Sequence, residues 1–107
     1  LTVDGSLRVD KDVTPEKFTL YQNYPNPFNP FTDIKFSLPS TERVHLVVYD
    51  LLGNVVREMV NEELNAGMHT YKWIGDNQNG SMVSAGMYFY KIQAGPHMHT
   101  KKMILLK

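Results

Sequence analysis

The sequence contains no cysteine, so neither a disulfide framework nor a thiolate metal site can form within it. That absence does not fix the compartment, because many secreted proteins also lack cysteine. Net charge is absent too, since 11 basic residues balance 11 acidic ones. There is therefore no electrostatic case for binding nucleic acid or an anionic membrane. No apolar run approaches the roughly 20 residues that a membrane-spanning helix needs.

What the sequence does contain is apolar alternation with a period of two residues, which is typical of strands. The 107 residues suit one domain, and 42% of them are hydrophobic, as in ordinary globular proteins. Turn-forming residues separate the alternating runs. The predicted strands are residues 18–21, 33–38, 43–50, 55–60, 68–73, 86–94 and 98–106. The polar stretch NEELNAG is expected to be a connection, with room for a helical turn.

About seven strands, spaced roughly 8–12 residues apart, predict an all-β fold, an immunoglobulin-like antiparallel β-sandwich. Trp73 is the only tryptophan and is expected to fill the space between the two sheets. The domain is predicted to span residues 18–107, with residues 1–17 as a linker or the tail of a preceding domain.

The stretch YPNPFNPF raises the question of whether it is a ligand, a linker or part of the fold. Its prolines remove backbone donors and restrict the preceding residues to extended geometry, so it cannot lie in the middle of a sheet. The aromatic residues Tyr24, Phe28 and Phe31 are expected to anchor it on the sandwich. We predict a stiff clamp that leads the chain into the strand at residue 33; its structural residues are Pro25, Asn26, Pro27 and Phe28. A proline-rich ligand is the alternative, and the phenylalanines argue against it.

Two places could in principle hold a metal ion. The loop DNQNG clusters the oxygen-bearing residues Asp76, Asn77 and Asn79 before a glycine. A calcium loop of the helix-loop-helix type would need further oxygen ligands, so an Asx-rich turn is the preferred interpretation. His97 and His99 lie on one face of a strand, but no third ligand is apparent. We therefore predict no metal and no cofactor.

The aromatic row Tyr71, Trp73, Tyr88 and Tyr90 could stack on sugar rings, although large aromatic residues in central strands are usually interior. No motif of a nucleophilic serine and no carboxylate pair suited to acid-base catalysis is present. The sequence therefore predicts a domain that is not an enzyme.

The C-terminus, HTKKMILLK, continues the alternation. It places Lys102, Ile104 and Leu106 on one face and Met103 and Leu105 on the other. One interpretation is an ordinary last strand whose lysines deter edge-to-edge association. The other is a signal presented at an accessible terminus.

Several motifs together resemble the type IX secretion system C-terminal sorting domain. These are YPNPFNPFTDIKFSLP, VHLVVYDLLGNVVREMV, LNAGMHTYKW, NGSMVSAGMYFYKIQAG and KKMILLK, in this order. The middle of the sequence also resembles the immunoglobulin-like domain of the flagellar hook-capping protein.

The resemblance implies a non-catalytic domain that directs a larger secreted protein across the outer membrane. Its implied partners are the outer-membrane secretion machinery, a surface sortase and a covalently linked N-terminal cargo domain, with a location outside the cell or on its surface. The segments that match the signal comprise Gly86, Tyr88, Tyr90, Ile92, Lys101, Lys102, Met103, Ile104, Leu105, Leu106 and Lys107. A structural or carbohydrate-binding accessory domain of an extracellular enzyme is an alternative, and sugar-dependent retention in affinity electrophoresis would favour it. A flagellar scaffold domain is a third hypothesis.

Overall fold

The computed structural model describes residues 14–107, and within them it is built of strands joined by turns, with no helix. Each strand pairs antiparallel with its neighbours. The strands are β2 (Thr19–Leu20), β3 (Thr32–Leu38), β4 (Glu42–Tyr49), β5 (Val55–Leu64), β6 (Gly67–Trp73), β7 (Gly86–Ala94) and β8 (His97–Leu105). The described residues thus offer no helix long and apolar enough to cross a bilayer.

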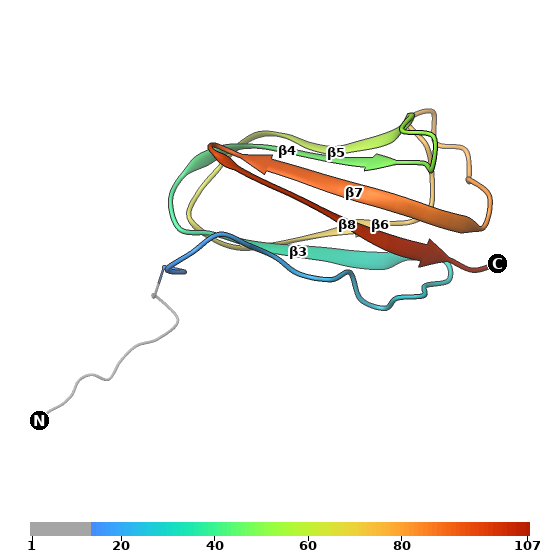
Figure 1. Ribbon diagram of the computed structural model, residues 1–107, viewed down its shortest axis with the longest axis horizontal. Helices are drawn as coiled ribbons and strands as arrows, with labels where there is room; N and C mark the ends of the chain where they lie inside the picture. Colours follow the sequence, from blue (N-terminus) through green and yellow to red (C-terminus); the bar gives the residue numbers. More distant parts are fainter. Residues whose placement is uncertain (1–13) are drawn as a thin grey trace, which may run out of the picture.

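The strands form two sheets that pack face to face (Figure 1). One sheet has three strands in the order β2-β3-β6, and the other has four in the order β5-β4-β7-β8. Sheets packed this way bury one face each and leave the other to solvent, which explains the alternation in the sequence. The predicted seven-stranded antiparallel sandwich is confirmed.

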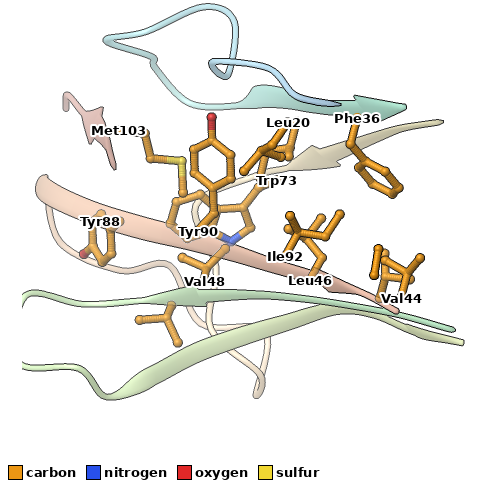
Figure 2. Close-up of a cluster of buried hydrophobic side chains, with 14 of the residues drawn as sticks. Leu20, Phe36, Val44, Leu46, Val48, Trp73, Tyr88, Tyr90, Ile92 and Met103 are labelled. Carbon is orange, nitrogen blue, oxygen red and sulfur yellow. The ribbon is translucent and has the colours of Figure 1, made fainter. Parts of the chain in front are cut away.

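The core lies between the sheets, where side chains from both inner faces meet (Figure 2). Trp73 is only 1% exposed there. Its ring packs against Phe28 with a centroid separation of 5.6 Å and meets the edge of Tyr88 at 5.4 Å. Its indole Nε1 donates a hydrogen bond to the carbonyl oxygen of Asp76 at 2.9 Å, so this large side chain is buried without an unsatisfied donor.

The prediction for the stretch after β4 was partly wrong. β5 continues to Leu64, so residues 61–64 belong to a strand and not to a polar connection with a helical turn. β5 is an edge strand, and Asn61, Glu62 and Glu63 are exposed there. With neither face of this part buried, no apolar alternation marks it as a strand.

Residues 21–28, which we call the crossing segment, connect the two sheets ahead of β3. In its middle, Tyr24 pairs with Asp33 of the three-stranded sheet, with N···O distances of 3.0 and 2.9 Å. At its end, Phe28 forms a parallel bridge with Leu105 of the four-stranded sheet. In Figure 1 the chain ahead of β3 accordingly runs toward the C-terminal end of β8.

The aromatic anchors of this stretch were only partly predicted. Phe28 is 1% exposed and belongs to the core, whereas Tyr24 is 80% and Phe31 42% exposed. Backbone pairing with Asp33 holds Tyr24 in place and makes burial of its ring unnecessary for anchoring. Phe31 lies beneath the Lys72 ammonium, with Nζ 4.1 Å from the ring centroid.

Candidate functional site

The residues assigned to the sorting signal come together on two adjacent strands. β7 and β8 pair antiparallel, and their register places Tyr88 opposite Met103, Tyr90 opposite Lys101 and Gly86 opposite Leu105. Lys107 lies just beyond the end of β8. Two segments separated by eight residues along the chain thus form one surface and one part of the core.

Five of these eleven residues contribute to the core. Tyr90, Ile92 and Met103 have no exposed surface, and Leu105 is 2% and Tyr88 7% exposed. Because side chains alternate across a strand, these five residues point toward the opposite sheet. They cannot contact a partner unless the domain opens.

Five others are exposed, namely Gly86, Lys102, Ile104, Leu106 and Lys107, and Lys102 and Ile104 lie on the outer side of the four-stranded sheet. Lys102 lies opposite Phe89, and Ile104 lies opposite Met87. Ile104 is 37% and Leu106 49% exposed, while Lys101, on the inner side, is half-buried. Lys102 and Lys107 thus lie on either side of the exposed aliphatic side chains of Ile104 and Leu106.

The outer backbone edge of β8 is only partly open, because the crossing segment covers its C-terminal half. The Phe28 N–H donates to the Ile104 carbonyl oxygen at 2.9 Å, and the Leu106 N–H donates to the Phe28 carbonyl oxygen at 2.8 Å. The Asn26 Oδ1 accepts a hydrogen bond from the Ile104 N–H at 3.0 Å. The side chain of Gln22 adds a bond to the Lys102 carbonyl oxygen at 2.8 Å. Edge strands with free backbone groups invite pairing with other chains, and this cover protects the last residues of β8 from it.

Tyr90 links the same two parts of the chain from inside the core. Its hydroxyl donates to the Tyr21 carbonyl oxygen and accepts from the Asn23 N–H, both at 2.8 Å. Burial raises the pKa of Tyr90 to about 12, and the hydrogen bond from the Asn23 N–H partly offsets this. The phenol is therefore neutral at physiological pH and serves as a structural hydrogen-bonding group.

In the candidate metal loop, one carboxylate oxygen of Asp76 and the side-chain oxygen of Asn77 are engaged in hydrogen bonds. The Asp76 Oδ2 accepts a hydrogen bond from the Arg57 guanidinium at 2.8 Å, and Arg57 also donates to the Asn77 carbonyl oxygen at 3.0 Å. The Asn77 Oδ1 accepts from the backbone N–H groups of Asn79 and Ser81 at 2.9 and 3.0 Å. This is the Asx-rich turn that the sequence favoured, and within residues 14–107 no group of three histidine, aspartate or glutamate side chains is placed to hold a metal ion.

The histidine pair and the aromatic row also have structural surroundings. His97 stacks on Phe18 at a centroid separation of 5.0 Å, and His99 lies tilted 5.4 Å from the same ring. Trp73, Tyr88 and Tyr90 are buried, and Tyr71 stacks on Phe36 at 6.0 Å. The row is therefore part of the core and not a platform for sugars.

The sequence did not predict a second aromatic surface, which is distinct from the row of Tyr71, Trp73, Tyr88 and Tyr90. A cleft of about 530 Å³ opens on the outer face of the three-stranded sheet. Its lining residues are Tyr21, Gln22, Tyr24, Asp33, Lys35 and Thr70. The alternation of Asp33 and Lys35 against the core residues of β3 was visible in the sequence, but the approach of Tyr21 and Tyr24 depends on the path of the crossing segment.

Two solved structures are similar to the chain in fold. One is the dimeric latent PorU from Porphyromonas gingivalis, with 20% identity, a TM-score of 0.67 and coverage of 97% of this chain. The other is PorZ from the same organism, described as an essential bacterial surface component of the type-IX secretion system, with 15% identity, a TM-score of 0.57 and 82% coverage. The chain spans only 10% and 11% of the lengths of these two proteins. The comparison with curated proteins gives no match.

A family model supplies the assignment. The model described as a secretion system C-terminal sorting domain matches residues 22–106, from the crossing segment to the end of β8. Strands β3 to β8, including the two that carry the predicted signal, lie within this match, and β2 lies just ahead of it. The chain belongs to the family of type IX secretion system C-terminal sorting domains.

Proposed function

We propose that this sorting domain directs a covalently linked, larger protein across the outer membrane, and that the secretion machinery recognises the outer face of β7 and β8 together with the terminal residues. The family assignment supports the sorting role. The observation that carries the finer proposal is the division of β8: Met103 and Leu105 are buried, whereas Lys102, Ile104 and Leu106 face solvent.

The exposed residues have the composition of a docking site. Ile104 and Leu106 offer apolar surface at the C-terminal end of β8, and Met87 on the neighbouring strand is half-buried beside them. Lys102 and Lys107 add positive charge at the border. Interfaces commonly combine an apolar centre with a polar rim of this kind.

We further propose that a surface sortase cuts the domain from its cargo and that the cargo is secreted or anchored at the cell surface. The linker and the cut would lie within residues 1–17, and of these the first 13 lie outside the described residues. A sorting signal performs no catalysis, so any enzymatic activity would reside in the cargo. The kinship with the flagellar hook-capping domain stays a prediction.

The test is export of a reporter protein fused to this domain in a bacterium that has the secretion system. Deleting residues 101–107 is a poor variant, because it removes the core residues Met103 and Leu105 and the partners of Phe28. The double substitution Lys102→Glu and Ile104→Thr changes only exposed side chains and keeps a β-branched residue in the strand.

A matched control is available on the other sheet. Lys72→Glu and Met68→Thr make comparable changes on the outer face of β6, where both side chains are exposed. We expect surface reporter with the unmodified domain and with the control pair, and periplasmic retention with the β8 pair. Thermal melting of each purified domain verifies folding. Equal export of the two double variants would show that this face of β8 is not recognised.

A further inference from the structure

The cleft on the outer face of the three-stranded sheet has the size of a small-molecule site. At about 530 Å³ it lies within the range of roughly 300–1,000 Å³ typical of ligand pockets. Asp33, Lys35 and Thr70 place it on the sheet opposite to the one that carries β7 and β8. Its lining residue Gln22 also donates a hydrogen bond to the Lys102 carbonyl oxygen, which links the cleft to the backbone of β8.

Its two aromatic rings are held on a rigid backbone although they are exposed. Tyr21 donates its N–H to the Lys35 carbonyl oxygen at 3.0 Å, and Tyr24 pairs with Asp33 through both backbone groups. Between the two tyrosines, Asn23 is 2% exposed. Such fixed support lowers the entropy that must be lost when a ligand binds.

The buried side chain of Asn23 strengthens this support. Its Nδ2 donates to the Thr32 Oγ1 at 2.9 Å and to the Pro25 carbonyl oxygen at 3.2 Å, and its Oδ1 accepts from Gln22 Nε2 at 2.6 Å. Tyr24 is thus 80% exposed although hydrogen bonds on both sides hold its backbone in place. Large exposed aromatic residues on a fixed backbone are a feature of binding surfaces.

The chemistry of the lining restricts the ligand. Every one of its side chains carries a hydrogen-bonding group: two phenols, an amide, a carboxylate, an ammonium and a hydroxyl. A purely apolar ligand would desolvate these groups without providing partners. The single carboxylate of Asp33 and the single ammonium of Lys35 balance, so the lining does not favour a strongly charged ligand of either sign.

A sugar ring satisfies these restrictions, because a pyranose combines a face of C–H groups with a rim of hydroxyls. The C–H face can pack on an aromatic ring, and the hydroxyls can exchange hydrogen bonds with the polar groups around it. The Lys35 ammonium lies over the Tyr21 ring, 4.9 Å from its centroid, and therefore covers one face of that ring. The open face of Tyr24 remains for stacking.

We propose that this cleft binds a neutral hexopyranose unit of a glycan. Tyr24 provides the stacking face, and Asp33, Lys35 and Thr70 bind the hydroxyls. The site is distinct from the buried aromatic row, and glycan binding does not depend on recognition of β8 by the secretion machinery.

Affinity electrophoresis of the whole chain through gels that contain dextran, mannan or galactan tests the proposal. We expect retardation in at least one of these gels, and a loss of about tenfold or more in apparent association constant for Tyr24→Ala, as expected for an aromatic anchor. Tyr24→Phe keeps the ring and should retain most of the binding. Tyr49→Ala removes a half-buried aromatic ring from the outer face of the other sheet and should bind as the unmodified protein does.

Three results would overturn the proposal. The first is no retardation in any of the three gels by a folded protein, as verified by its thermal melt. The second is retardation that Tyr24→Ala leaves unchanged, which would place the contact elsewhere. The third is an equal loss for Tyr24→Ala and Tyr49→Ala, which would indicate a general effect of removing an aromatic ring.

Discussion

Replacing Tyr90 by phenylalanine tests the link between the crossing segment and the core. The variant keeps the ring, which has no exposed surface, and removes only the hydroxyl. Two hydrogen bonds of 2.8 Å are then lost, and the N–H of the buried residue Asn23 is left without its acceptor. Leaving a buried donor unsatisfied costs about 1–3 kcal/mol, so we expect the free energy of unfolding at pH 7 to fall by that amount.

The pH dependence provides a second, independent signature. The pKa of Tyr90 is about 12 in the folded protein and near 10.0 for an ordinary tyrosine. The unfolded chain therefore releases this proton first, so the associated stability is fully present below pH 10 and is lost as the pH rises toward about 12. Between pH 9 and pH 11, this single group should lower the free energy of unfolding by about 1 kcal/mol.

Urea unfolding followed by the fluorescence of Trp73, the only tryptophan, measures both effects at pH 7, 9 and 11. All other residues are the same in the two proteins, so their contributions cancel in the difference. We expect the difference in the free energy of unfolding between the unmodified protein and Tyr90→Phe to narrow by about 1 kcal/mol from pH 9 to pH 11. If this difference in the free energy of unfolding stays constant, Tyr90 ionises as an ordinary tyrosine does. Its hydroxyl would then be more accessible to water than the structure shows.

Three further substitutions test other parts of the structure. Trp73→Ala should destabilise the domain by about 3–5 kcal/mol, the range for removing a large buried side chain, and an unchanged thermal melt would remove Trp73 from the core. Phe28→Ala should lower the free energy of unfolding by a similar amount, about 3–5 kcal/mol. It should also speed amide hydrogen exchange at Leu106, whose N–H donates to the Phe28 carbonyl oxygen. Unchanged exchange at Leu106 would contradict the covering of the β8 edge by the crossing segment. Asp76→Ala leaves the Arg57 guanidinium without its carboxylate partner and should lower the urea midpoint by the equivalent of about 1–3 kcal/mol, whereas an unshifted midpoint would mean that this ion pair adds no net stability.

The sequence predicted strands well where one face of a strand is buried and the other is not. In β7, Tyr88, Tyr90 and Ile92 are all buried, and they alternate with Phe89 and Lys91, which are half-buried. A one-residue shift would move these three residues to solvent, so the pattern fixes both the strand and its inner face. The burial of Met103 and Leu105 follows from the same rule.

The same signal disappears where neither face is buried. Residues 61–64 pair with β4 through their backbone, yet three of the four side chains are exposed, so composition alone indicates a loop.

The cleft on the outer face of the three-stranded sheet could not be predicted for a different reason. Tyr24 is nine residues from Asp33 in the sequence and meets it only because the crossing segment turns back on the sheet. Local patterns carry no information on such a path.

The cover of β8 by the crossing segment has a consequence for the order of folding. Asn26 and Ile104, which are joined by a hydrogen bond, are separated by 78 positions, almost the whole length of the domain. Contacts between such distant positions require a large loop to close, and they are typically late and slow to form.

During synthesis, the residues of β8 also emerge after all the other strands. The bonds from Phe28 to Ile104 and Leu106 can therefore form only after the residues of β8 have been synthesised. The covered edge is thus a structural mark of completed folding. A partner that requires it would bind the finished domain and pass over a nascent or truncated chain.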